Sequence, residues 1–173
     1  INGELLTEKL VGRAKRVEST SQQDYESTSR DAKTQSYRVK SLTDNVQSSS
    51  FNLVSDVEND ILKIAVINRY EKKEPAVAFI KGFGLKSGAL ASSVAHDSHN
   101  IIVIGCDDES MAMAANMIIE NKGGFAVYDK DVKMCLPLPV AGIMTNEDAF
   151  KVASDYQEIK DMSKQLGSPL GDP

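Results

Sequence analysis

The chain has 173 residues, of which 41% are hydrophobic and 26% are charged. These values are typical of a globular protein, and the length suits one domain, alone or with a piece of another. The net charge is −5, and the strongest basic cluster, residues 13–16, is short and lies near an end of the chain. Because nucleic-acid binders carry clustered positive charge, we expect no nucleic-acid partner.

The cysteine pattern and the absence of long apolar runs predict a cytoplasmic protein. Cys106 and Cys135 lie far apart in apolar stretches, which indicates two buried thiols in a reducing compartment. No apolar run approaches the length of a membrane span, and no signal peptide is visible, so we expect no membrane partner. Because the chain begins with Ile1 instead of Met, we expect either a processed chain or a fragment of a longer one.

The first fifty residues differ in composition from the rest. Residues 1–17 contain a strand-like piece with a turn signal at Asn2-Gly3. Residues 18–50 are dominated by Ser, Thr, Gln, Asp and Lys, which predicts a linker or a surface segment lying on a neighbour. We therefore expect the folded domain to occupy residues 51–173.

Four β-rich runs and a helix follow in that domain. The runs, which are joined by short connections, are residues 61–67, 76–80, 89–95 and 101–104. Asp107 or Asp108 can then cap a helix that stops at Gly123-Gly124. Its apolar positions fall on one face at helical spacing: Met111, Ala114, Ala115, Ile118 and Ile119.

A hairpin and a second helix complete the predicted domain. Residues 125–128 and 132–136 pair around the turn 129–131. Residues 145–148 resemble a capping box, and the helix after them carries an apolar stripe formed by Phe150, Ala153, Tyr156, Ile159 and Met162. The order β-β-β-β-α-β-β-α, with its short strand-to-strand links, predicts an α+β fold: a mixed or mostly antiparallel sheet with helices packed on it.

The densest group of polar side chains lies between the third and fourth runs. It contains Ser92, Ser93, His96, Asp97, Ser98, His99 and Asn100, and it holds both histidines of the chain. Imidazole and carboxylate groups together suit metal ligation or proton transfer. The alternative is structural, because Asp, Ser and Asn bond to nearby backbone in turns and a half-buried histidine can simply be hydrogen-bonded.

Two further segments each allow a functional and a structural interpretation. Residues 81–88 contain Gly-x-Gly and two lysines, which would suit a phosphate cradle, but the spacing matches neither the P-loop nor the dinucleotide motif. Glycines that permit positive φ in a tight loop explain them equally well. Residues 137–144 form an apolar, proline-stiffened connection that suits a pocket or a domain interface, or a rigid bridge over the core.

Two long stretches carry a resemblance to a known family. The run KGFGLKSGALASSVAHDSHNIIVIGCDDESMAMAANMI, and after it GGFAVYDKDVKMCLPLPVAGIMTNE, resemble the C-terminal domain of adenine deaminases in the same order. The resemblance covers roughly residues 40–165, and the motifs AHDSHN and LPLPVAGIM make it specific. The opening INGELL is similar to a remnant strand of the small β-domain that amidohydrolases build from both chain ends.

The resemblance implies an amidohydrolase-type hydrolase of purine salvage that converts adenine and water to hypoxanthine and ammonia. Its Mn²⁺ or Fe²⁺ would lie in a barrel upstream of Ile1 and activate a water. This chain contains no His-x-His motif and only two histidines. We therefore expect the isolated chain to hold neither metal nor another cofactor and to be inactive alone.

Three hypotheses remain for the domain itself. In the first, residues 92–100 face the mouth of the N-terminal barrel and cover the bound adenine. In the second, the domain is a non-catalytic interaction module in a homo-oligomer, with LPLPVAGIM and the Met- and Ala-rich helix as its interface. In the third, His96, Asp97 and His99 form an independent metal site, although three ligands at most are available.

Overall fold

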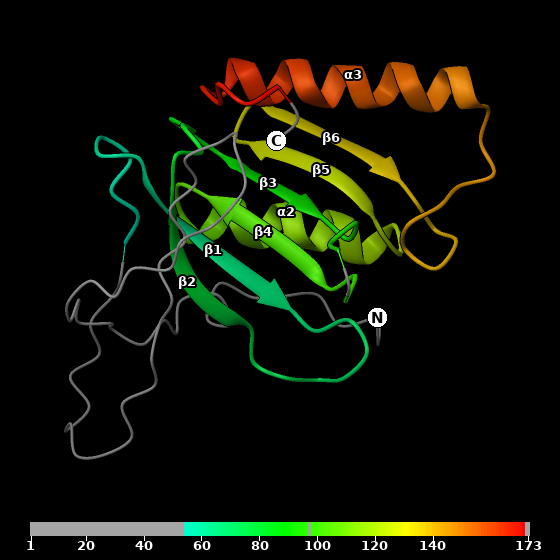
Figure 1. The fold of residues 1–173 in the computed structure, drawn as a ribbon, viewed down its shortest axis with the longest axis horizontal. Coiled ribbons are helices and arrows are strands. Elements are labelled where there is room, and N and C mark those ends of the chain that lie inside the picture. Colours follow the sequence, from blue (N-terminus) through cyan, green and yellow to red (C-terminus); the bar gives the residue numbers. More distant parts are fainter. Residues whose placement is uncertain (1–53, 97, 172–173) are drawn as a thin grey trace, which may run out of the picture.

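The structure, a computed structural model, describes residues 54–96 and 98–171. The expectations for residues 1–17 and 18–50, and the candidate Asp97, lie outside the described residues. Figure 1 shows a sheet with one helix on each side. The elements, in chain order, are β1 (Ile61–Ile67), β2 (Ala76–Lys81), β3 (Ala89–Ser92), β4 (Ile101–Gly105), α2 (Asp108–Glu120), β5 (Gly124–Asp129), β6 (Val132–Pro137) and α3 (Ala149–Gln165).

The six strands form one sheet in the order β2-β1-β4-β3-β5-β6, and all neighbouring strands are antiparallel. This confirms the predicted α+β class and the predicted element order, and it resolves the choice between a mixed and a mostly antiparallel sheet. The predicted third strand is shorter than expected, because it ends at Ser92 instead of Ala95. At Ser93 the backbone leaves the ladder, and its amide bonds to the carbonyl of Gly124 at 3.0 Å.

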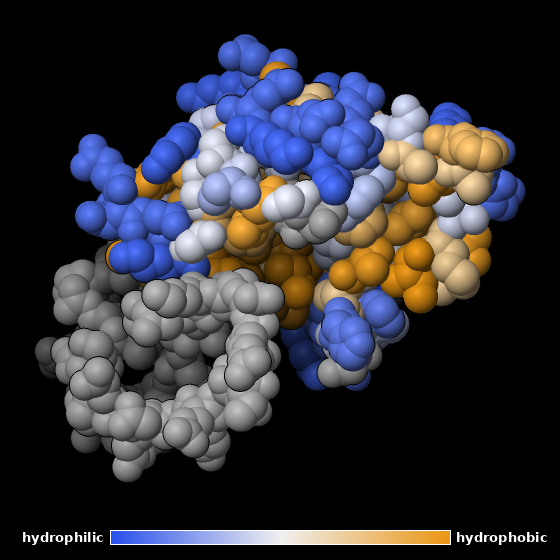
Figure 2. All heavy atoms as spheres, turned by 45° about the horizontal axis from the view of Figure 1, so that its top comes forward, coloured by the Kyte–Doolittle hydropathy of each residue, from blue (hydrophilic) through white to orange (hydrophobic). Residues whose placement is uncertain are grey.

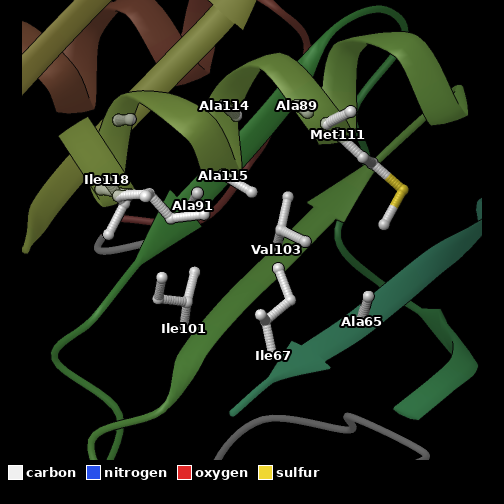
Figure 3. Packing of buried hydrophobic residues seen from close by; sticks show 13 residues of the cluster. Ala65, Ile67, Ala89, Ala91, Ile101, Val103, Met111, Ala114, Ala115 and Ile118 are labelled. Atoms are coloured by element: carbon white, nitrogen blue, oxygen red, sulfur yellow. The ribbon is translucent and has the colours of Figure 1, made fainter. Parts of the chain in front are cut away.

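Helix α2 closes one face of the sheet. Its predicted apolar positions are confirmed: all five are buried and pack on β3, β4 and β5. Figure 3 shows this cluster, in which small alanines of the helix and of β3 lie opposite Val103 and Ile101 of β4. Small side chains at the contact allow the helix to lie close to the sheet, as the dense packing of protein interiors requires. Asp107 is the cap, with its carboxylate accepting from the Ser110 amide at 2.8 Å.

Helix α3 lies on the opposite face and covers β5 and β6. The core on this side is a second cluster that includes Leu62, Ile104, Val127 and Ile159. It is separate from the α2 cluster because successive side chains of a strand point to opposite faces. Over β2, β1 and β4 this face is covered by neither helix; Ile64, Ile80 and Ile102 are partly exposed there, whereas Leu62 and Ile104 are buried.

The predicted stripe of the second helix is partly wrong. Tyr156, Ile159 and Met162 do face the sheet, but Phe150 is 87% exposed and Ala153 is exposed as well. The sheet-facing row is completed by Val152, and a turn of about 100° per residue places Phe150 on the other side of the helix. The predicted cap is also displaced, because Asp148 and not Thr145 accepts from the first amides of the helix.

Candidate functional site

The antiparallel strands gather the connections at two ends of the sheet. One end, called the His99 end below, holds the polar loop 93–100 together with residues 68–75, 121–123 and 138–148. The other, called the Asp60 end, holds residues 56–60, 82–88 and 129–131 and the segment after α3. The two glycine-rich or polar segments singled out from the sequence, 81–88 and 92–100, therefore lie at opposite ends and do not form one site.

The polar loop at the His99 end is folded on itself. The His99 amide donates to the Ala95 carbonyl at 2.8 Å, and the Ser98 amide donates to the His96 carbonyl at 3.0 Å. His99 has a φ of 49°, in the left-handed region that residues other than glycine rarely adopt. Such a conformation costs of order 1–3 kcal/mol and persists only when surrounding contacts enforce it.

Arg69 and Tyr70, in the connection after β1, supply those contacts. The Arg69 guanidinium donates to the His99 carbonyl at 3.2 Å, and the Arg69 amide donates to the Asn100 side-chain oxygen at 3.3 Å. The hydroxyl of the next residue, Tyr70, donates to the Ser98 carbonyl at 3.1 Å. The loop is thus held by a neighbouring connection as well as by its own turns.

Ser93 joins the loop to the apolar connection after β6. Its side chain is fully buried, and its hydroxyl accepts from the Gly124 amide at 2.8 Å and donates to the Gly142 carbonyl. Gly142 in turn lies against the backbone of Gly123. The two motifs that make the sequence distinctive, AHDSHN and LPLPVAGIM, therefore lie side by side, and the Ser93 hydroxyl is committed to internal bonds.

The imidazole of His99 is the polar group that stands out. Its Nδ1 atom is buried and has no hydrogen-bond partner among residues 54–96 and 98–171. Buried polar atoms are almost always paired, so an unpaired one calls for an explanation, such as a bound water, an ion, a catalytic role or a group from a partner. His96 and Ser98 are exposed on the same loop, Ser92 lies half-buried at the end of β3, and Asn100 is used in holding Arg69.

Exposed hydrophobic side chains gather at the same end. Five of the seven large ones in the described part of the chain lie there, with exposed fractions from 42% to 87%: Tyr70, Val94, Val140, Met144 and Phe150. Figure 2 shows a hydrophobic surface on the right side of the molecule, over the segment that joins β6 to α3. Contiguous exposed apolar surface marks an interaction site in a folded protein.

At the Asp60 end, by contrast, the loop amides have acceptors within the described part of the chain. The Asp60 carboxylate accepts from the amides of Gly82 and Gly84 at 2.8 and 2.7 Å, both glycines having positive φ. The amides that would have cradled a phosphate are therefore occupied by a carboxylate of the same chain. This favours the structural interpretation of residues 81–88 as a tight loop.

Neither cysteine is poised for chemistry. Burial raises the pKa of the Cys106 thiol to about 11, with the nearby carboxylates of Asp107 and Asp129 adding to the shift. Burial likewise raises the pKa of Cys135 to about 11. Both thiols are therefore protonated at neutral pH, and a thiol is a poor nucleophile compared with a thiolate.

Within residues 54–96 and 98–171, no three or more His, Cys, Asp or Glu side chains come together in a way that would hold a metal ion. The described residues therefore do not fit a metal centre. Because Asp97 lies outside them, the hypothesis of a site formed by His96, Asp97 and His99 stays a prediction. None of the described helices is long and apolar enough to cross a membrane.

Arg69 and Tyr70 are the residues that sequence reasoning missed. They belong to the connection between β1 and β2, which looks like an ordinary charged turn in the sequence. The bonds they make end on backbone carbonyls, and a carbonyl acceptor leaves no trace in the residue types around it. The one available signal was an arginine and a tyrosine placed directly after a buried strand.

Comparison with known proteins gives a consistent family assignment. Residues 36–173 match the family described as the adenine deaminase C-terminal domain. The match begins inside the stretch 18–50 that was interpreted as a linker or surface segment.

The curated relatives that match are named adenine deaminase. The chain is 51% identical over 116 residues to an adenine deaminase of Parabacteroides distasonis, which covers 67% of this chain and 21% of the relative. It is 50% identical over 119 residues to one of a Sulfurovum species and 47% identical over 122 residues to one of Methanosarcina acetivorans, in each case covering 22% of the relative. The chain thus spans about a fifth of the length of the relatives it matches.

Proposed function

The chain belongs to the adenine deaminase C-terminal domain family, and from this premise we propose that it forms the C-terminal part of an enzyme that converts adenine and water to hypoxanthine and ammonia. The relatives that match are several times longer than the matching segment. The remaining part of the enzyme is proposed to be the barrel that the family resemblance implies, and the domain is proposed to act together with it.

The His99 end is the part of the domain that faces this barrel in the proposal. One observation carries it: the same end combines a buried, unpartnered imidazole nitrogen with five exposed hydrophobic side chains. A surface of this kind lowers its free energy when it is covered, because apolar area leaves water and the orphan nitrogen gains a partner. At the Asp60 end, the Asp60 carboxylate accepts from the amides of Gly82 and Gly84, and no buried side-chain atom without a hydrogen-bond partner is found there among the described residues.

In this arrangement the loop 93–100 covers the bound adenine. The Mn²⁺ or Fe²⁺ of the barrel would supply the activated water that attacks the purine ring. The contribution of this chain is a rigid polar lid: it excludes bulk water from the site and places two imidazoles, whose ring nitrogens can donate or accept hydrogen bonds, at its edge. His99 is the stronger candidate, because its ring nitrogen is already withdrawn from water.

The kinetic effect of the two histidines tests the proposal. His96→Ala and His99→Ala are made separately in the full-length enzyme, and kcat/KM for adenine is measured beside a control, Lys151→Ala, which breaks an exposed ion pair on α3. We expect a loss of at least about tenfold for His99→Ala and less than about twofold for the control. If both histidine variants remain within about twofold, the loop is not part of the active site.

The assay of the isolated chain is a second test. Because no ligand set for a metal is found among the described residues, we expect no turnover of adenine by this chain with added Mn²⁺. Turnover by the isolated chain would contradict the division of labour proposed here.

The second candidate function is a non-catalytic interaction module, and the exposed Val140, Met144 and Phe150 favour it. In that case the connection 138–148 seals the domain onto the rest of the enzyme or onto a second copy, and the polar loop stays in water. Hydrogen exchange distinguishes the two. Protection of residues 93–100 in the assembled enzyme supports the lid, and protection of residues 138–148 alone supports the module. Homo-oligomer formation and a cytoplasmic location stay predictions.

A further inference from the structure

Arg69 connects three segments at the His99 end. It is the second residue after β1, and its guanidinium donates to the Ala141 carbonyl at 2.8 Å and to the His99 carbonyl at 3.2 Å. The acceptors belong to the AHDSHN and LPLPVAGIM motifs, which are far apart in sequence. One side chain therefore fixes the distance between the two motifs.

The side chain is itself held in place from two sides. The Asn68 carboxamide accepts from the amides of Tyr70 and Glu71 at 2.8 and 2.9 Å, which folds the turn that carries Arg69. The guanidinium lies over the Tyr70 ring, 5.5 Å from its centre, in a cation–π contact. The space beside it is filled, because a Cβ on Gly142 would lie 2.1 Å from the guanidinium.

The two contacts require the shape of a guanidinium. Arginine presents several N–H donors in a planar fork, so it can serve two carbonyls from one fixed position. A lysine ammonium is a single point of charge on a flexible stem, and it cannot hold the same two acceptors with the same geometry. The charge alone is therefore not what the site uses.

The consequence falls on His99. Its amide is bonded to the Ala95 carbonyl and its carbonyl to Arg69, so the peptide groups on both sides of the residue are fixed. These bonds hold the left-handed backbone of His99, with φ at 49°, and in this conformation the ring is half-buried and its Nδ1 has no hydrogen-bond partner among the described residues. Without the guanidinium, the loop is free to relax toward an ordinary conformation in which the ring points elsewhere.

We propose that Arg69 is a positioning residue for His99: it does not touch the substrate, and it sets where the imidazole stands when the domain meets the rest of the enzyme. The inference rests on the proposed function of the His99 end and deepens it. Tyr70 contributes in the same direction through its hydroxyl bond to the Ser98 carbonyl.

A double-mutant cycle in the full-length enzyme tests this. Arg69→Ala, His99→Ala and the double variant are compared by kcat/KM for adenine, with the unfolding midpoint of each enzyme measured in parallel. If Arg69 acts through His99, then Arg69→Ala lowers kcat/KM about tenfold in the parent enzyme and less than about twofold when His99 is already absent. A purely structural residue would lower activity by the same factor in both backgrounds, and that result would overturn the inference.

Milder variants keep the test decisive if Arg69→Ala does not fold. Arg69→Lys retains the positive charge, and we expect it to lose most of the activity that Arg69→Ala loses, since one ammonium cannot bridge both carbonyls. Tyr70→Phe removes one exposed hydroxyl bond, and we expect a loss of about threefold that vanishes in the His99→Ala background. Full activity of Arg69→Lys, or a loss in Tyr70→Phe that persists without His99, would contradict the inference.

The same data separate the two levels of the account. If His99→Ala has no effect on kcat/KM, the proposed function of the His99 end fails, and the positioning role fails with it. If His99→Ala is strongly impaired but Arg69→Ala is equally harmful in both backgrounds, only the positioning role fails.

Discussion

The two ends of this sheet solve the same structural problem in different ways. At the Asp60 end, a carboxylate accepts from two glycine amides, and the backbone amide of Lys86 reaches the Leu166 carbonyl at 2.7 Å. At the His99 end, the backbone is equally well bonded, but a buried ring nitrogen has no partner among the described residues and hydrophobic side chains remain in water.

This difference indicates which part of the domain is finished. A domain that folds for its own stability satisfies its buried polar groups, as the Asp60 end does. Left-handed backbone occurs at both ends, at Asp60 and at His99, so the difference between the ends lies in the unsatisfied nitrogen and the exposed hydrophobic side chains. The His99 end is rigid but incomplete, and that combination is expected of a surface that is prepared for a partner.

The largest expected effect concerns the rigidity of the His99 end. A Cβ on Gly123, whose φ is 131°, would lie 2.3 Å from the Cα of Gly142. We expect Gly123→Ala to lower the free energy of unfolding by about 3 kcal/mol, since both the backbone conformation and the space exclude a methyl group. Urea unfolding of the chain measures it. The control is Gly171→Ala, with no atom within 4 Å of the new Cβ, and equal midpoints for the two variants would contradict the tight packing described here.

The next largest effect is expected from a substitution that removes a hydrogen bond at the Asp60 end and leaves the His99 end unchanged. Asp60→Asn keeps the shape and tolerates the positive φ of 56°, but it leaves one of the two glycine amides without an acceptor. We expect a loss of about 1–2 kcal/mol in the free energy of unfolding. Asp131→Asn, in the exposed turn between β5 and β6, is the control, and we expect it to change stability by less than about 0.5 kcal/mol. A stability of Asp60→Asn equal to that of the control would show that the carboxylate is not needed there.

The sequence predicted the layers of this fold better than its ends. The stripe of α2 was visible because helical spacing and burial coincide at Met111, Ala114 and Ile118. The predicted stripe of α3 wrongly included Phe150, because the residue type alone does not tell whether an aromatic side chain is buried or exposed. The role of Arg69 could not be predicted, because its two carbonyl acceptors become neighbours only when β1 has paired with β4, β4 with β3, β3 with β5 and β5 with β6.

The candidate site was predictable in the same partial way. The polar loop was singled out from its residue types, and the structure brings it beside the LPLPVAGIM connection through Ser93 and Gly142. Residue types alone do not tell whether each polar group is buried or which hydrogen-bond partner it has. The burial of the Ser93 hydroxyl and the missing partner of His99 Nδ1 depend on where the chain turns after β3.

The smallest expected effect on the stability of the isolated chain comes from a substitution in the hydrophobic surface at the His99 end. Phe150 is 87% exposed, so Phe150→Ser should leave the stability of the isolated chain within about 0.5 kcal/mol. In the full-length enzyme, where we propose that this surface is covered, the same change should destabilise the domain by about 1–2 kcal/mol. Met113→Ser, an exposed site on α2 away from the His99 end, is the control and should have no larger effect in the full-length enzyme than in the isolated chain. Equal effects of Phe150→Ser in both settings would mean that the partner does not cover this surface.

The most direct test of the central claim compares one substitution at each end in the full-length enzyme. We predict that His99→Ala lowers kcat/KM for adenine by at least about tenfold with little change in the unfolding midpoint, because it alters what the domain presents to the active site. We predict the reverse for Asp60→Asn, a lower midpoint with kcat/KM of the folded enzyme within about twofold of the parent. If His99→Ala keeps its activity, or if both variants lose activity and stability in parallel, the two ends do not differ in function and the account is contradicted.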